Sequence, residues 1–217
     1  MTQIAIVGGH GQVAQALIPR LVAAGHQPVA LIRNDSQVST VEKLGATARR
    51  LDIEATDAEG FAAAFEGCDA VVFAAGGGPD GNIERKRTVD LEGSLKSIEA
   101  AQSVGIARFV QISAIGVDLT LPEDTEPVWR AYVEAKRDAD AALRATSLDW
   151  TILRPGGLTD DEPTGLVTVA DSASRGEIPR ADVAAVVAEV LDTGAGVRRQ
   201  WDVVGGQTPV AEAVANA

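Results

Sequence analysis

A glycine-rich break near the start of the chain is the first candidate for chemistry. An apolar segment at 3–7 stops at the glycines, and a helical pattern begins directly after them. Glycines let the backbone turn sharply and approach an anion closely, and the N-terminus of a helix attracts negative charge. With a second strand about 20 residues on, the break predicts a pyrophosphate site for a dinucleotide; the alternative is a purely structural turn. The residues of this predicted site are Gly8, Gly9, His10, Gly11, Gln12 and Val13.

The end of the second apolar run indicates which dinucleotide is bound. An acidic residue there would hydrogen-bond the ribose 2′-hydroxyl of NAD, whereas an arginine accommodates the 2′-phosphate of NADP. Here Arg33 comes first after the run, and Asp35 follows two places later. Arg33 therefore predicts a preference for NADP(H), with NAD(H) as the second cofactor. The alternative is a solvated surface arginine with Asp35 as its neighbour.

Tyr132 and Lys136 form the second candidate group. Their spacing of four residues puts them on one face of a helix. A lysine ammonium near a phenol lowers its pKa from about 10, so Tyr132 could act as a general acid or base toward a carbonyl or alcohol. Ser113 ends an earlier apolar run, where open α/β sheets place their ligand groups, and its hydroxyl could polarise the same oxygen. The alternative is a chance spacing in which Tyr132 only packs.

These residues need a sheet that brings the ends of several strands together. Apolar runs of strand length alternate with helical patterns, and the runs are nearly continuous in Val, Ile, Ala and Leu. Such runs are typical of parallel strands buried on both faces. We predict an α/β fold with a doubly wound parallel sheet, forming a single domain over 1–217 with 156–178 as a small substrate-side lid. The predicted strands are 3–7, 28–32, 46–53, 69–75, 107–113 and 149–155, and a long helical stretch is predicted over 82–105.

Composition narrows the class of protein. The 217 residues are 46% hydrophobic, as expected for a globular protein, and the net charge of −12 argues against nucleic acid as a partner. One cysteine, Cys68, and two histidines make a metal site an unfavoured interpretation. No apolar run reaches the roughly 20 residues that span a membrane, and no segment resembles a signal peptide. We therefore expect a cytoplasmic protein without a membrane partner, and a homo-oligomer stays open.

Seven segments, in this order, resemble the short-chain dehydrogenase/reductase superfamily: "GGHGQV", "LIR", "LDI", "VVFAAG", "RFVQIS", "YVEAK" and "LRPGGLTDDEPTG". More closely, the chain resembles the atypical NAD(P)-binding members of NmrA-like or NAD-dependent epimerase/dehydratase type, over essentially its whole length. The resemblance implies a Rossmann fold, with Gly8 to Val13 on the pyrophosphate and Arg33 on the adenosine 2′-phosphate. The other cofactor contacts that it implies are Asp52 and Ile53 beside the adenine, Ala74, Ala75 and Gly76 along the far ribose, and Pro155 and Gly156 near the nicotinamide.

The resemblance also bears on function. It implies a Ser113–Tyr132–Lys136 catalytic group, but the helix position where many active relatives carry an asparagine holds Asp90. The leading hypothesis is an NADPH-dependent oxidoreductase that acts on a small carbonyl, quinone or similar electrophile by hydride transfer. The second is an NAD(P)-binding redox sensor of NmrA type without catalysis, and the third is a nucleotide-sugar epimerase or dehydratase, which the short substrate region disfavours.

Overall fold

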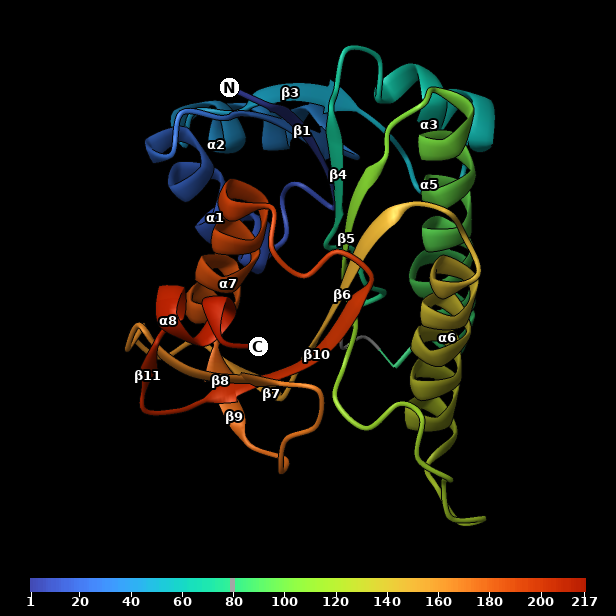
Figure 1. The fold of residues 1–217 in the computed structure, drawn as a ribbon. Coiled ribbons are helices and arrows are strands. Elements are labelled where there is room, and N and C mark those ends of the chain that lie inside the picture. The colour runs from blue at the N-terminus through green and yellow to red at the C-terminus, as the bar shows by residue number, and fades with distance from the viewer. Residues whose placement is uncertain (79–80) are drawn as a thin grey trace.

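The computed structural model describes residues 1–78 and 81–217, and its centre is a twisted sheet between two layers of helices (Figure 1). Within these residues the sheet has the strand order β11-β8-β10-β6-β5-β4-β1-β2-β3. Its strands are β1 (Gln3–Val7), β2 (Gln27–Ile32), β3 (Thr47–Arg50), β4 (Ala70–Phe73), β5 (Arg108–Ile112), β6 (Asp149–Pro155), β8 (Leu166–Ala170), β10 (Arg199–Gly205) and β11 (Thr208–Pro209). The helices are α1 (Gln12–Ala23), α2 (Val38–Lys43), α3 (Ala58–Ala64), α4 (Ile83–Arg85), α5 (Glu92–Ser103), α6 (Pro127–Arg144), α7 (Arg180–Thr193) and α8 (Val210–Ala215).

The sheet confirms the predicted Rossmann architecture. The first six strands run parallel in the spatial order β3-β2-β1-β4-β5-β6, and β10 continues the parallel set beside β6. The strand order reverses between β1 and β4, so the loops at their carboxyl ends diverge and leave a crevice. Among the described strands of this sheet, β8 alone runs opposite to the others, and β11 pairs with it antiparallel and so has the direction of β10.

Both faces of the sheet are covered, which explains the continuous apolar strands. Ile4 and Ile6 of β1 belong to a core with α1, α2, α7 and α8, whereas Ala5 and Val7 belong to a core with α3, α5 and α6. Figure 1 shows these two groups of helices on opposite sides of the sheet. Because successive strand residues point to opposite faces, every position in such a strand must be apolar.

The predicted helix over 82–105 is interrupted in the structure. After the short α4, the residues Lys86–Leu91 form a π-helical turn, and α5 begins only at Glu92. A π turn inserts an extra residue into a helix and is frequent at functional sites. Here it places the carboxylate of Asp90 entirely inside the protein.

The segment 156–178 forms more regular structure than a loop. Besides β8, it contains β7 (Gly157–Thr159), which pairs with β9 (Glu177–Pro179) in a separate parallel ribbon. Asp160 accepts hydrogen bonds from Gln12 Nε2 (3.1 Å) and Arg180 Nη1 (2.7 Å), so the segment is joined to the first residues of α1 and α7.

No helix within 1–78 or 81–217 is long and apolar enough to cross a membrane.

Candidate functional site

The glycine break is a tight turn wedged between two strands. Gly8 adopts a φ of +80°, and an added Cβ would lie 2.8 Å from the Cα of Ala75 after β4. A Cβ at Gly9 would lie 2.8 Å from the Cα of Ala30 in β2, and the Gly9 N–H donates to Leu31 O at 2.9 Å. Glycine is therefore required at both positions by packing alone. These contacts explain both glycines structurally, and Gly8 also lines the cavity described below.

Gly11 has a different role in the same turn. It is the N-cap of α1, it provides no side-chain cap, and the first turn of the helix contains no acidic residue. A Cβ added at Gly11 would meet only Gly8 O at 3.2 Å and Ala74 O at 3.9 Å within the described part of the chain. The first N–H groups of a helix lack intrahelical acceptors and carry a partial positive charge. The Gly11 N–H itself donates to Gly8 O at 2.8 Å, so an anion at the start of α1 would be received by the next N–H groups, beside Gly11.

A cavity of about 260 Å³ lies at the carboxyl ends of β1 to β4, in the crevice where the strand order reverses. This position is where open α/β sheets bind ligands. Nine residues predicted to contact the cofactor line it: Gly8, His10, Gly11, Arg33, Asp52, Ile53, Ala74, Ala75 and Gly76. Its wall also includes Gln37, Glu54 and Arg85, which the sequence did not single out.

The other predicted cofactor residues lie outside this wall. Val13 is buried in the core beneath α1, and Gln12 extends to Asp160. Gly9 packs on β2, as described above. Pro155 is buried at the end of β6, and Gly156 approaches Gly176 so closely that an added Cβ would lie 2.1 Å from its carbonyl oxygen.

Charged side chains gather at the adenosine end predicted for the cavity. The guanidinium of Arg33 faces Glu54, with Nη1 3.7 Å from Oε2. Asp35, which the sequence placed beside Arg33, instead pairs with Arg50 at 2.9 Å. Because Asp35 is paired with Arg50, the positive charge of Arg33 faces the cavity and Glu54.

Lys136 connects α6 to the cavity wall. Its buried ammonium lies 3.2 Å from Asp90 Oδ1 and donates to Ile112 O at 3.2 Å and Ala75 O at 3.4 Å. Burial opposes the charge on Lys136, but Asp90, together with Tyr132 and Asp140, more than compensates, and the pKa of Lys136 is raised. Since Ala75 lines the cavity, Lys136 stands directly behind the predicted ribose contact.

Tyr132 lies one turn before Lys136 on the same face of α6. The Lys136 Nζ is 6.0 Å from the centre of the phenol ring, and the centre of the Trp129 ring is 5.3 Å from the same point. Burial raises the pKa of Tyr132, and the nearby Lys136 opposes this rise without cancelling it. The phenol is therefore protonated at neutral pH and is a potential proton donor.

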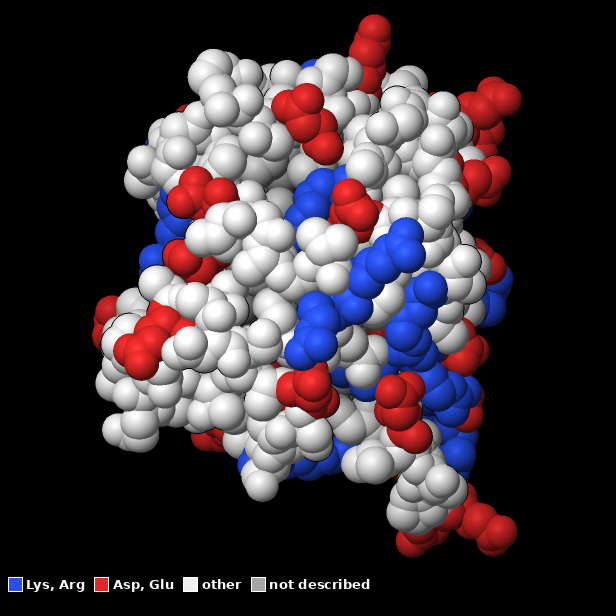
Figure 2. Space-filling view, in the orientation of Figure 1, with Lys and Arg blue, Asp and Glu red and all other residues white. Residues whose placement is uncertain are grey.

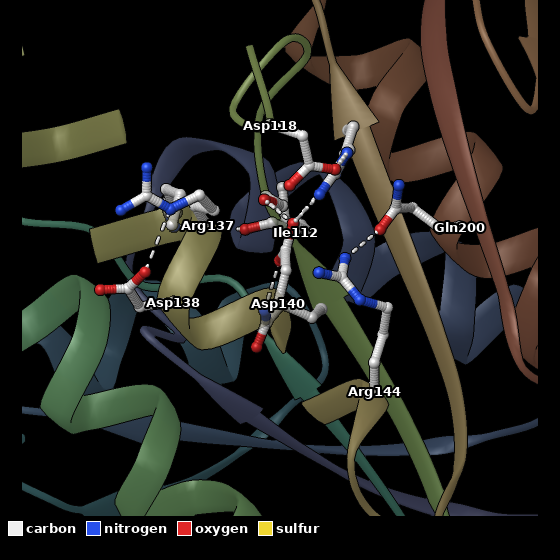
Figure 3. A network of polar contacts seen from close by, with 11 residues as sticks. Ile112, Asp118, Arg137, Asp138, Asp140, Arg144 and Gln200 are labelled. Carbon is white, nitrogen blue, oxygen red and sulfur yellow. Dashed lines mark hydrogen bonds and ion pairs between the residues drawn. The ribbon is translucent and has the colours of Figure 1, made fainter. Parts of the chain in front are cut away.

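A buried polar network surrounds Asp140 (Figure 3), and Ser113 is part of it. Its hydroxyl donates to Asp140 Oδ2 at 2.8 Å, and Gln111 Nε2 donates to the other carboxylate oxygen at 2.7 Å. Arg154 completes the network, with Nε 2.9 Å from Asp140 Oδ2 and Nη1 2.6 Å from Asp118 Oδ2. The structure thus brings Tyr132 and Lys136 together, while the hydroxyl proton of Ser113 points to Asp140.

Asp140 is the main site residue that the sequence reading missed. It is fully buried, and burial raises its pKa against the opposing effects of Arg154, Ser113 and Gln111. A signal was available, because Asp140 follows Lys136 by the same four-residue step that separates Lys136 from Tyr132. Extending the four-residue spacing by one more helical turn from Lys136 reaches Asp140.

A second cavity, of about 320 Å³, lies between the end of α6 and the starts of β6 and β10. Figure 2 shows Lys and Arg gathered over α6 and the neighbouring strand ends. Each arginine in this cavity already has a protein acceptor: Arg144 donates to Gln200, Arg198 to Ser147 O and Arg199 to Asp171. Only the contact of Arg199 with Asp171 among these three is an ion pair.

The remaining candidates have structural surroundings. Burial raises the pKa of the Cys68 thiol, which disfavours the reactive thiolate. Asp160 is bonded to Gln12 and Arg180. Within 1–78 and 81–217, no three His, Cys, Asp or Glu side chains are grouped so that they could hold a metal ion.

Fold and cavity together define an NAD(P)-binding Rossmann protein. The residues fit a dinucleotide, because Gly11 opens the N-terminus of α1 to the cavity and an arginine lines the opposite end. The chain belongs to the NAD(P)H-binding family, whose sequence model matches residues 8–194. This membership confirms the predicted dinucleotide-binding class.

Similar proteins agree with this assignment. A Bacillus subtilis protein named an uncharacterized sugar epimerase is 37% identical, over 98% of both chains. A solved structure from Bacillus halodurans, provisionally described as an NAD-dependent epimerase/dehydratase, matches with a TM-score of 0.93 and 38% identity over 100% of both chains. An anaerobillin reductase from Escherichia coli O157:H7 matches with a TM-score of 0.77 and 25% identity, over 94% of this chain and 97% of that one. These similarities confirm the predicted resemblance to NAD(P)-binding epimerase/dehydratase-type proteins.

The two roles of the glycines can be separated by alanine substitution. Gly9→Ala should lower the free energy of unfolding by about 1–3 kcal/mol, since its methyl group would overlap β2. Gly11→Ala should retain most of the stability but weaken NADPH binding about tenfold, because its methyl group enters the phosphate end. Urea unfolding and NADPH fluorescence titration measure the two effects. Strong destabilisation by Gly11→Ala with unchanged binding would contradict this division.

Tyr132 can be titrated alone because it is the only tyrosine in the chain. Because its pKa is raised, the midpoint of the rise in phenolate absorbance should lie above the ordinary tyrosine value of about 10. Lys136→Met should move the midpoint higher still, since the lysine charge favours the phenolate. Lys43→Met, an exposed change on α2, is the control and should leave the midpoint in place. Circular dichroism checks folding at each pH; a wild-type midpoint below the ordinary value would exclude this account of the phenol.

Proposed function

We propose that this protein is an NADPH-dependent reductase of a small carbonyl, quinone or similar electrophile. The observation that carries the proposal is the contact between Lys136 Nζ and Ala75 O. Because Ala75 lines the cavity, this contact supports a position of the Tyr132–Lys136 pair beside the predicted nicotinamide ribose. The name of the anaerobillin reductase, a relative at 25% identity, supports the same reaction class.

When bound, the reduced nicotinamide supplies a hydride. Tyr132 would donate its phenolic proton to the oxygen of the substrate, so that one hydride and one proton together convert a carbonyl to an alcohol. Lys136, held charged by Asp90, would stabilise the phenolate that remains. Trp129, whose surface is 43% exposed, would form one wall of the substrate site beside Tyr132.

Ser113 would contribute less than the sequence motif implies. Its hydroxyl proton is held by Asp140, so the oxygen is oriented by that carboxylate. A hydroxyl with its proton engaged in this way cannot also donate it to a substrate oxygen. In the proposed reaction Tyr132 is therefore the principal proton donor.

The cofactor preference and the lid are parts of the same proposal. Arg33 favours NADPH because a guanidinium can form paired hydrogen bonds with the 2′-phosphate. The segment 156–178 would cover the substrate side, and the hydrogen bonds of Asp160 to Gln12 and Arg180 support a position over the start of α1.

A second candidate function is an NAD(P)-binding sensor without turnover. The observation that favours it is the ion pair of Lys136 with Asp90. By the family resemblance, many active relatives carry an asparagine at the position of Asp90. A carboxylate that holds the ammonium reduces the charge available to Tyr132. Turnover measurements separate this function from the reductase.

The decisive substitution is Tyr132→Phe. It should lower the rate of NADPH oxidation with quinone or aldehyde substrates by about 10²- to 10⁴-fold, the usual contribution of general acid catalysis, and leave NADPH affinity within about twofold. Ser113→Ala should lower the rate by less than about tenfold, because its proton is engaged by Asp140.

Absorbance measurements of NADPH consumption test both variants. A wild-type protein that binds NADPH tightly but consumes none with any of these substrates would favour the sensor. Full activity in Tyr132→Phe would refute the proposed proton donor.

A further inference from the structure

Glu54 lies between two arginines at the adenosine end of the cavity. Its Oε2 is 3.7 Å from Arg33 Nη1 and 3.6 Å from Arg85 Nε, and its Oε1 accepts a hydrogen bond from Thr88 Oγ1 at 2.8 Å. Arg33 follows β2, Glu54 follows β3, and Arg85 ends α4, so three separate elements bring these charges together. All three residues line the cavity.

The contacts to Oε2 are ionic and too long for hydrogen bonds. Within the residues that the structure describes, the guanidinium of Arg33 makes no hydrogen bond, and its side chain is 51% exposed. Its planar set of N–H donors therefore faces the cavity still able to bind oxygen atoms. A phosphate, with about two negative charges and three acceptor oxygens, suits such donors better than a carboxylate at this distance.

Among the described residues, Glu54 is the carboxylate that faces Arg33 in the cavity, and its Oε2 also lies near Arg85. Asp35 is engaged by Arg50, and Asp52 Oδ1 accepts from the Glu54 N–H at 3.1 Å. Thr88 fixes one oxygen of Glu54, which leaves the other directed at Arg33 and Arg85. A 2′-phosphate that approached the arginines would meet this negative charge at short range.

We propose that Glu54 sets the cofactor selectivity by competing with the 2′-phosphate for Arg33 and Arg85. The carboxylate holds both arginines toward the cavity when no phosphate is present and repels the phosphate when it arrives. Arg85 becomes the second arm of the phosphate site, from α4. The wild-type protein should then prefer NADPH over NADH only weakly. This inference rests on the NADPH preference within the proposed function.

The test uses small probes that isolate the adenosine end. Isothermal titration of the full chain compares adenosine 2′,5′-bisphosphate with adenosine 5′-monophosphate, which differ only in the 2′-phosphate. Glu54→Gln keeps an oxygen for Thr88 but removes the charge. It should bind the bisphosphate about tenfold more tightly, a modest gain because the site is partly open to solvent, and should bind the monophosphate as the wild type does.

Two further variants sharpen the result. Glu99→Gln makes the same charge change at an exposed position on α5 and should alter neither affinity. Arg85→Ala should weaken the bisphosphate about tenfold and leave the monophosphate unchanged. Melting temperatures with no probe present check that each variant is folded.

The proposal is overturned if Glu54→Gln leaves the affinity for the bisphosphate unchanged or lowers it. It is also overturned if the substitution raises the affinity for both probes equally, or if the wild type and the variant bind neither probe. These outcomes are independent of turnover. A protein that binds the probes as expected but fails to oxidise NADPH would refute the proposed reductase and keep the role of Glu54. Normal NADPH oxidation with no effect of Glu54→Gln on probe binding would support the reductase and refute the role of Glu54.

Discussion

The buried ion pair between Lys136 and Asp90 is the interaction on which the site depends. Its atoms are 3.2 Å apart, and both side chains are almost completely removed from solvent. Two isolated charges at this depth would be strongly unfavourable, so each requires the other. Asp90 also accepts a hydrogen bond from Gly77 N at 2.8 Å, and Lys136 donates to the carbonyls of Ala75 and Ile112. One pair thus joins α6, the π turn and the ends of β4 and β5.

The same helix face carries further charged side chains. Tyr132, Lys136, Asp140 and Arg144 follow one another at four-residue intervals along α6. Lys136 is balanced by Asp90, and Asp140 by Arg154, whose second partner Asp118 lies in the loop after β5. Hydrogen-bonded pairs of this kind fix the positions of their side chains. These pairs hold α6 against the ends of β4 and β5, and they fix the position of Tyr132 one turn before Lys136.

The sequence predicted the sheet well because its signals are local. Continuous apolar runs define the buried strands, and the positions of the glycines mark the first turn correctly. The different roles of those glycines could not be predicted, because Gly8 and Gly9 are required by contacts with Ala75 and Ala30, which are distant in the sequence. The π turn was also hidden, because the residues 82–105 carry a helical pattern and only the burial of Asp90 shows the extra residue.

Charge partners were the least predictable feature. Asp35 is the near neighbour of Arg33 in sequence, but the partner in space is Glu54, which reaches Arg33 only once β2 and β3 lie side by side. Asp140 on α6 is likewise held by Ser113, directly after β5, and by Arg154 on β6. Periodicity predicts which residues share a face, whereas ion pairs between elements depend on the register of the folded sheet.

A double-mutant cycle on Lys136 and Asp90 tests the central claim most directly. Lys136→Met and Asp90→Asn each leave one buried charge without its partner, and each should lower the free energy of urea unfolding by about 3–5 kcal/mol. The account predicts that the double variant loses far less than the sum of the two single losses, because no uncompensated charge remains. Losses that add to within about 0.5 kcal/mol would show that the pair is not coupled and would contradict the account.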